Sequence, residues 1–222
     1  MLDSADHILE WKSAGYAVEV ITVFTSFSTN KISPFVRKFL LESGFATPAD
    51  MEKGRKEEDN KAMKMLGVGW QHWDFIDAAF RETAVGAVYP TEKELFSGKI
   101  SAADRNLEAD LENRLKHFSE ADLILLPLGL GKHIDHALVR RVGEKAFAKN
   151  LIGYYADFPY ALKLKNWTFR IIKQTLFLNK SIKTMSATKR NILHLYSSQM
   201  PSLFKSDPNY PEIILIPKSA SI

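Results

Sequence analysis

Two histidines and an aspartate fall within four residues of the chain, directly after an apolar run. The stretch reads LPLGLGKHIDHALVRR, residues 126–141, with His133, Asp135 and His136 after two glycines. A neutral imidazole is a common zinc ligand, and a neighbouring carboxylate typically fixes which ring nitrogen carries the proton. The spacing favours a metal site in which both histidines face outward at the end of a strand. A catalytic zinc normally takes three protein ligands and a water, so this stretch supplies only part of such a site.

Two other interpretations of these residues stay open. A histidine on a protein surface needs no function, although two of them beside an aspartate at a strand end favour one. The glycines and Lys132 before a helix start also offer backbone N–H groups to a phosphate. The P-loop pattern is absent and the dinucleotide-binding glycine pattern is incomplete, so a metal site is the favoured interpretation.

The rest of the chain alternates strand-like and helix-like segments, which is typical of an α/β fold. Apolar or β-branched runs predict strands at 16–24, 70–75, 121–129, 151–158 and 212–217. Amphipathic or capped patterns predict helices at 6–15, 49–68, 100–118 and 134–147. Ile134, Leu138 and Val142 form the apolar stripe of the last helix. We expect a Rossmann-like, doubly wound, mainly parallel sheet in a three-layer sandwich, with sites at the carboxyl ends of its strands.

The composition limits the classes of function. The chain has no cysteine, which excludes disulfides and thiolate metal ligands and fits a reducing cytoplasm. No apolar run approaches the roughly 20 residues that span a bilayer. We expect a cytoplasmic protein with a single domain over 1–222, in which the basic and aromatic segment 161–190 forms a flanking subdomain. Binding of nucleic acid or a membrane surface through 161–190 stays an alternative, but a net charge of +4 does not argue for it.

Five segments together resemble the PIG-L/LmbE-like family of zinc-dependent N-deacetylases, which remove acetyl groups from N-acetylglucosamine-type conjugates. PLGLGKHIDHALVR resembles the family's glycine loop followed by His-x-Asp-His. RKEEDNKAMKMLGV resembles its Arg-x-x-Glu-Asp helix, and DFIDAAFR its Asp-Ala-x-x-Arg segment. YYADFPYA and NILHLYSSQMPSLF resemble segments of one branch of the family. The ordered combination is more specific than any one segment.

The resemblance implies a role for each residue of the histidine stretch. It makes His136 a zinc ligand, His133 the group that polarises the substrate carbonyl or donates a proton, and Asp135 the residue that orients a histidine. Asp157 and Tyr160 follow another predicted strand, where they fit either the edge of a site or a turn and its core. The activity implied is zinc-dependent hydrolysis of an N-acetyl group on a small sugar conjugate.

Three further residues become candidates for binding the sugar conjugate through the same resemblance. They are Arg55, Asp77 and Arg81. Each has a plain alternative. Arg55, together with Glu58 and Asp59, equally fits a solvated helix face. Asp77 and Arg81 stand four residues apart and equally fit an ion pair between themselves.

One part of the resembled pattern is missing from the chain. The family's earlier signature, Pro-His-x-Asp-Asp between its first strand and first helix, supplies the other metal ligands and the general base, and this sequence lacks it. We therefore expect a first strand upstream of Met1, in a longer product, and an incomplete zinc site within 1–222. The alternative is a catalytically inactive, shortened relative that binds a sugar or a phosphate without hydrolysis.

Overall fold

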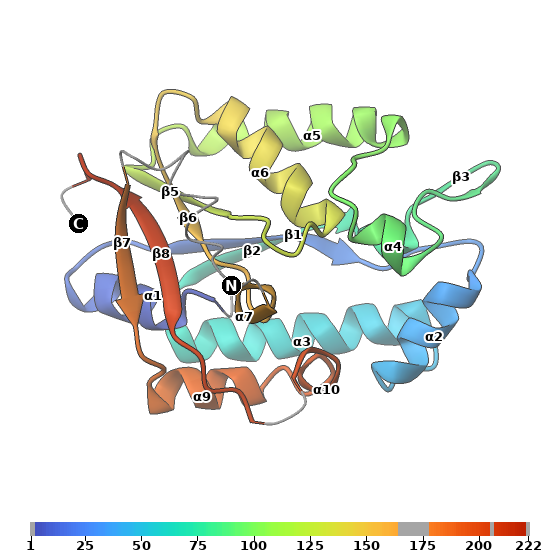
Figure 1. The fold of residues 1–222 in the computed structure, drawn as a ribbon, viewed down its shortest axis with the longest axis horizontal. Coiled ribbons are helices and arrows are strands. Elements are labelled where there is room, and N and C mark those ends of the chain that lie inside the picture. The colour runs from blue at the N-terminus through green and yellow to red at the C-terminus, as the bar shows by residue number, and fades with distance from the viewer. Residues whose placement is uncertain (1–2, 164–177, 205–206, 221–222) are drawn as a thin grey trace. The chain divides into compact units, whose positions relative to one another are not determined.

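A computed structural model describes residues 3–163, 178–204 and 207–220 (Figure 1). The chain divides into two compact units, each built from two separate stretches. Unit 1 comprises Met1–Leu95 and Thr184–Tyr210, and unit 2 comprises Phe96–Lys183 and Pro211–Ile222. The histidine stretch therefore belongs to unit 2, and the Arg-x-x-Glu-Asp helix belongs to unit 1.

Unit 1 is mostly helical and contains one parallel pair of strands. Its elements are α1 (Ala5–Ser13), β1 (Glu19–Ser26), α2 (Pro34–Glu42), α3 (Pro48–Leu66), β2 (Gly69–Ile76), η1 (Ala78–Phe80), β3 (Glu82–Thr83), β4 (Gly86–Ala87), α4 (Glu92–Leu95), α9 (Ala187–His194) and α10 (Met200–Leu203). Strand β1 runs parallel to β2, with Glu19 opposite Gly69. Helix α3 begins after the cap residue Thr47 and ends at Gly67, whose φ of 64° suits glycine.

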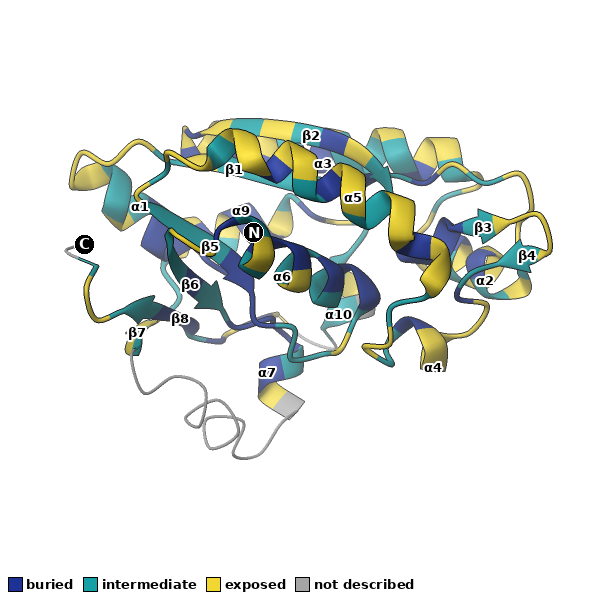
Figure 2. Cartoon of the chain, turned by 90° about the horizontal axis from the view of Figure 1, so that it is seen from above, coloured by how far each residue is buried: buried dark blue, intermediate teal, exposed yellow. Residues whose placement is uncertain are grey.

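The core of unit 1 lies between helices from both stretches of chain. Apolar faces of α1, α3 and α9 meet there, which explains why these short or polar helices are stable. The buried cluster consists of Ala5, Ile8, Ala62, Met63, Leu66, Val68, Ile192 and Tyr196. Helix α3 carries buried and exposed positions along its length, as an amphipathic helix does. Strand β2 likewise mixes exposed, half-buried and buried residues (Figure 2).

Unit 2 is built on a four-stranded sheet with helices. Its elements are η2 (Ala102–Asp104), α5 (Arg105–Leu115), η3 (Lys116–Phe118), β5 (Leu123–Pro127), α6 (Ile134–Ala146), β6 (Leu151–Tyr155), α7 (Tyr160–Lys163), β7 (Leu178–Lys183) and β8 (Glu212–Pro217). The strand order is β5-β6-β8-β7. Strands β5 and β6 are parallel, whereas β8 is antiparallel to both β6 and β7 (Figure 1). The sheet is therefore mixed, because its last two strands do not follow the βαβ pattern.

Helix α6 packs closely on β5, and this packing positions His133, Asp135 and His136 at the start of the helix. The predicted stripe is confirmed, with Ile134 and Leu138 fully buried and Val142 nearly so. Gly143 permits the close approach, because a Cβ atom there would lie 2.7 Å from the Leu126 side chain.

The α/β class expected from the sequence is confirmed, but the expected mainly parallel sheet is not found: among the described strands, the pairs β3–β4, β6–β8 and β7–β8 are antiparallel. Helix α2 and the β3–β4 hairpin were not expected. Of the predicted subdomain 161–190, residues 164–177 lie outside the described residues; 178–183 form β7 in unit 2, and 187–190 open α9 in unit 1. Within the residues that the structure describes, no helix is both long and apolar enough to cross a bilayer.

Candidate active site

The loop between β5 and α6 makes two left-handed turns before the first histidine. Gly129 has a φ of 73° and Lys132 a φ of 56°. Glycine adopts this conformation freely, whereas a side-chain-bearing residue does so at a cost of about 1–2 kcal/mol. Strain of this kind persists where the surrounding structure holds the backbone in place, and it is frequent at functional sites.

His133 caps helix α6 with its own ring. Its Nδ1 accepts a hydrogen bond from the backbone N–H of Asp135 at 3.2 Å. Because Nδ1 accepts in this contact, the hydrogen-bond pattern places the ring proton on Nε2. His133 is therefore held as a neutral imidazole whose Nε2–H can donate to a substrate oxygen. Asp135 is buried in the first turn of α6.

His136 is held by a carboxylate from the neighbouring strand. Its Nδ1 lies 2.5 Å from Oδ1 of Asp157, which is completely buried, and the backbone N–H of Leu130 donates to Oδ2 of the same carboxylate at 2.9 Å. Burial alone would raise the pKa of Asp157, but the hydrogen bond and charge of His136 and the loop amides hold that pKa below its ordinary value. A histidine fixed through Nδ1 by a buried carboxylate is the usual arrangement around a metal-binding imidazole.

The pairing of His136 with Asp157 follows from the parallel strands. Residues 128–133, between β5 and α6, form what we call the histidine loop. Asp157 comes directly after β6 and the histidine loop directly after β5. The carboxyl ends of parallel strands lie at one edge of a sheet. The sequence resemblance implied Asp135 as the residue that orients a histidine, and Asp157 fitted either the edge of a site or a turn and its core. In the structure the carboxylate bonded to His136 is that of Asp157.

Arg140 on α6 binds the backbone at the start of the loop between β5 and α6. Its Nη1 donates to the Leu128 carbonyl at 2.8 Å, and its Nε donates to Glu144 at 2.9 Å. The Tyr154 hydroxyl donates to the same Glu144 carboxylate, and the Arg140 guanidinium lies 5.0 Å from the centre of the Tyr154 ring. Burial and then the Glu144 carboxylate raise the pKa of Tyr154 to about 12, so its phenol keeps donating. No pattern in the sequence predicted this support.

The candidate substrate-binding residues all belong to unit 1. Arg55 lies on α3 between two aromatic rings, 5.4 Å from the centre of Phe27 and 5.0 Å from that of Phe39. Its buried Nε has no hydrogen-bond partner among the residues described. Burial lowers the pKa of Arg55, and the charge of Asp77 acts against this shift.

Asp77 and Arg81 are both tied to the turn that follows β2. Asp77 Oδ1 accepts from the Ala79 backbone N–H at 2.9 Å and so caps η1. Arg81 is buried, donates through Nε to the Ile76 carbonyl at 2.9 Å and lies 4.8 Å from the centre of the Phe24 ring. These contacts do not join the two side chains to each other.

Glu58 is buried on α3 and holds the segment after α9. Its carboxylate accepts from the Ser198 backbone N–H at 2.7 Å, from the Ser198 hydroxyl at 2.8 Å and from the Ser197 hydroxyl at 3.1 Å. The solvated helix face that sequence analysis left open does not describe Glu58, which is only 8% exposed.

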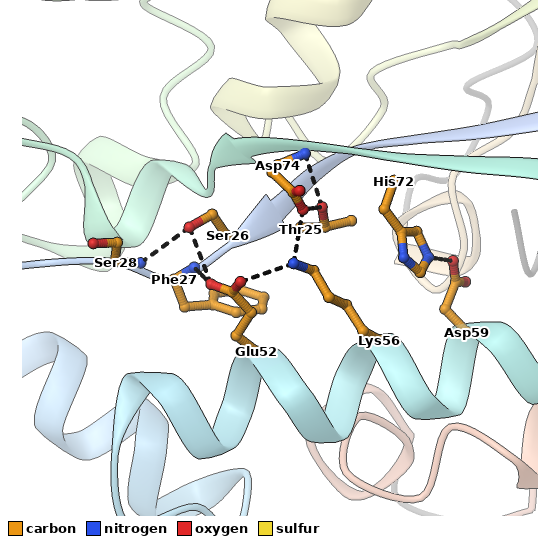
Figure 3. A network of polar contacts seen from close by, with 9 residues as sticks. All are labelled: Thr25, Ser26, Phe27, Ser28, Glu52, Lys56, Asp59, His72 and Asp74. Carbon is orange, nitrogen blue, oxygen red and sulfur yellow. Dashed lines mark hydrogen bonds and ion pairs between the residues drawn. The ribbon is translucent and has the colours of Figure 1, made fainter.

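Asp59, the next residue, links the same segment to β2. Its Oδ1 accepts from the Tyr196 hydroxyl at 2.6 Å, and its Oδ2 accepts from Thr22 at 2.9 Å. The same Oδ2 lies 2.7 Å from His72 Nε2 (Figure 3). Burial and then the charge of Asp59 raise the pKa of Tyr196 well above its ordinary value. Two segments that the sequence resemblance singled out therefore meet inside unit 1.

A second polar network lies at the carboxyl ends of β1 and β2. Lys56 donates to Glu52 at 2.8 Å and to Asp74 at 2.7 Å, and Thr25 donates to the same Asp74 oxygen at 2.8 Å (Figure 3). Asp74 has a φ of 57° at an irregularity in the pairing of β1 with β2. The hydrogen bond from Lys56 is the largest cause that lowers the pKa of Asp74. Burial acts to raise the pKa of Glu52, but the hydrogen bond from Lys56 contributes to lowering it overall.

Replacing Lys56 with methionine is expected to raise the pKa values of Glu52 and Asp74. Both carboxyl groups have lowered pKa values, so their contribution to stability is present above their unfolded pKa values of about 4 and is lost as the pH falls through the folded values. The difference in free energy of unfolding between wild type and variant should therefore be largest near pH 7 and disappear in acid. Urea denaturation from pH 7 to pH 2.5 measures it. The exposed Lys53→Met on the same helix should show no such pH-dependent difference, and an equal one there would contradict the assignment.

The described residues do not by themselves form a complete metal site. Nowhere in 3–163, 178–204 or 207–220 do three or more histidine, aspartate or glutamate side chains gather so that they could hold a metal ion. His136 fits one ligand position, because Asp157 holds its Nδ1 and a metal would bind through Nε2. Among the described residues His136 therefore supplies one ligand, whereas a catalytic zinc normally takes three protein ligands.

Comparisons with known proteins show the fold. No model of a protein family and no curated protein matches the sequence. A deacetylase of the teicoplanin biosynthesis pathway is similar in structure, with a TM-score of 0.74 and 20% identity over 99% of this chain and 94% of that one. A teicoplanin deacetylase in its zinc-inhibited form gives a TM-score of 0.73 and 19% identity over 100% and 97%.

Two more distant structures share the fold. The N,N'-diacetylchitobiose deacetylase of Pyrococcus horikoshii gives a TM-score of 0.51 and 13% identity over 97% of this chain and 79% of that one. The 4-carboxy-2-hydroxymuconate hydratase of Pseudomonas putida KT2440 gives 0.52 and 12% over 100% and 92%. Proteins with different reactions therefore have this fold, and the reaction must be argued from the site.

Proposed function

We propose that the chain is a hydrolase that removes the acetyl group from an N-acetylglucosamine-type conjugate. One observation carries the proposal: a buried carboxylate, Asp157, holds His136 beside the neutral His133 at the carboxyl ends of β5 and β6. The similarity to solved deacetylases and the five resembled segments support it. The hydratase with the same fold has to be excluded by experiment.

In this proposal His133 acts on the carbonyl of the amide. Its Nε2–H donates to the carbonyl oxygen and stabilises the negative charge that develops there when water adds. A donor of this kind typically contributes about 3–4 kcal/mol to the stability of the transition state. Asp157 keeps the His136 ring in one orientation, and the assignment of Asp135 as an orienting residue stays part of the proposal. Arg55, Asp77 and Arg81 are proposed to bind the sugar conjugate.

Zn²⁺ is the proposed cofactor, with His136 as one ligand. Support comes from the sequence resemblance and from the zinc-inhibited form of a similar deacetylase. Because the described residues supply no group of three ligands, we derive no chemical step through the ion.

The decisive test is release of acetate from a set of N-acetylglucosamine conjugates, with and without added Zn²⁺. We expect release from at least one conjugate and a decrease of about 100-fold or more in turnover for His133→Ala. Absence of release from every conjugate, or unchanged turnover in His133→Ala, would overturn the proposal. Hydration of an unsaturated carboxylic acid instead of acetate release would assign the chain to the other reaction.

Replacing His136 with alanine is expected to weaken zinc binding at least 10-fold, because the variant removes a ligand. Equilibrium dialysis with Zn²⁺ measures the affinity without any need for turnover. The exposed His117→Ala is the matched control, and its affinity should equal that of wild type. Equal zinc affinity in His136→Ala and His117→Ala would remove His136 from the ligand set.

A second candidate function is binding of a sugar or phosphate without hydrolysis. The lack of a group of three ligands among the described residues favours it. It predicts saturable binding of a sugar conjugate or of inorganic phosphate with no acetate released. Calorimetry beside the acetate assay separates the two candidates.

A further inference from the structure

The ring of Tyr160 occupies the space beside Gly131. A Cβ atom built on Gly131 would lie 2.4 Å from the Tyr160 ring, far inside van der Waals contact. No other amino acid fits at position 131 unless the ring moves. Tyr160 opens α7, just beyond Asp157, so the segment that supplies the partner of His136 also supplies a cover for the histidine loop.

A second aromatic ring lies against His133 itself. Phe96 meets the His133 ring edge to face, with ring centres 5.0 Å apart and an angle of 71° between the planes. The centre of the Phe96 ring is also 5.8 Å from that of Tyr160. Two residues further on, Gly98 packs on the stem of Lys132, where a Cβ atom would lie 3.4 Å from the Lys132 Cβ. We call Phe96 and Tyr160 the aromatic frame of the histidine loop.

The frame adds a restraint of another kind to the hydrogen bond between His133 and the Asp135 amide. The bond from the Asp135 amide fixes Nδ1 of His133 but leaves the tilt of the ring plane open. An edge-to-face neighbour restrains that tilt, because aromatic pairs favour this geometry by about 0.5–1.5 kcal/mol. The centres of the His133 and His136 rings are 5.7 Å apart, so a change in tilt at one ring alters the geometry of the pair.

We propose that Phe96 and Tyr160 are positioning residues, which hold the His133 ring so that its Nε2–H faces the reacting carbonyl. The inference rests on the proposed function, because that function supplies the carbonyl that the Nε2–H of His133 faces. It goes beyond that function by assigning roles to two residues that do not themselves react. Misplacement of a reacting group by about 1 Å can cost 100-fold in rate, which sets the expected size of the effect.

The first test uses the contact between Gly131 and Tyr160. Gly131→Ala should lower kcat about 100-fold with KM changed less than about twofold, because the new methyl group collides with the ring and displaces the loop. Tyr160→Ala alone should lower kcat less. The double variant should turn over no more slowly than Tyr160→Ala, since the collision is then gone. A double variant with the two losses multiplied would overturn the role of Tyr160.

The second test needs no turnover. The His133 ring lies edge to face against Phe96, so we expect the ring current of Phe96 to shift the His133 ring protons. The Hε1 resonance of His133 can be assigned among the six histidines by its loss in His133→Gln. Phe96→Leu should shift this resonance and lower kcat, again with little change in KM. Phe118→Leu is the matched control: Phe118 is half-buried in unit 2 but precedes the amino end of β5. It should change neither quantity.

The two readouts separate this inference from the proposed function. If wild type releases no acetate but Phe96→Leu alone shifts the His133 resonance, the proposed function fails and the positioning contact stands. If wild type releases acetate and Phe96→Leu behaves like Phe118→Leu in both readouts, the proposed function stands and the positioning role is overturned.

Discussion

Asp157→Asn is expected to lower both zinc affinity and the rate of acetate release by about 10–100-fold, the range seen when a carboxylate behind a metal-binding histidine is removed. Asparagine keeps the shape of the side chain and can still accept from the Leu130 amide. It loses the charge that fixes the proton on His136 Nδ1. The His136 ring can then adopt the other tautomer or turn over, so Nε2 no longer presents a lone pair reliably.

The measurement compares Asp157→Asn with Asp122→Asn, an exposed aspartate that lies just before β5 in the same unit. Zinc affinity by dialysis and acetate release are determined for both variants, with circular dichroism as a check that each is folded. The Asp122 variant should match wild type. If Asp157→Asn binds zinc and turns over substrate as well as wild type does, the contact between Asp157 and His136 contributes to neither property.

Glu58→Ala is expected to reduce the free energy of unfolding by about 3–4 kcal/mol. The carboxylate is buried and accepts one backbone N–H and two hydroxyl groups from Ser197 and Ser198. Removing it leaves these donors without their acceptor inside the protein. Urea denaturation measures the loss, and amide exchange should rise most in α9 and α10, which Glu58 helps to hold.

The neighbouring residue provides a sharp control. Glu57 stands on the same helix but is exposed, so Glu57→Ala should change the free energy of unfolding by less than about 0.5 kcal/mol. Equal losses in the two variants would mean that helix propensity, and not the buried contacts, sets the stability of this region.

Local patterns in the sequence predicted the elements that carry the site. The stripe of Ile134, Leu138 and Val142 predicted a helix at 134–147, and α6 runs from Ile134 to Ala146. Periodicity reports which face of a helix is apolar, and α6 packs on β5 through this face. Helix α2 was missed although Ser33 and Pro34 carry a start signal and Val36 and Leu40, its two buried residues, repeat at helical spacing.

Long-range polar partners could not be predicted in the same way. Glu58 and Asp59 stand in a helix rich in charge, where a solvated face is the ordinary expectation. Their partners lie 137–140 residues later, in a segment whose serines and tyrosine have no periodic signal. Asp157 was recognised as a residue after a strand, but its pairing with His136 depends on which strands are neighbours.

The position of β8 has a consequence for synthesis on the ribosome. This strand lies inside the sheet, between β6 and β7, although it is made after both of them. Unit 1 likewise needs α9 to complete its helical core. Domains usually fold as their residues emerge, from the N-terminus onward. Here β6 keeps an open edge while more than fifty residues are added, so the native sheet closes only after residues 212–217 have left the exit tunnel.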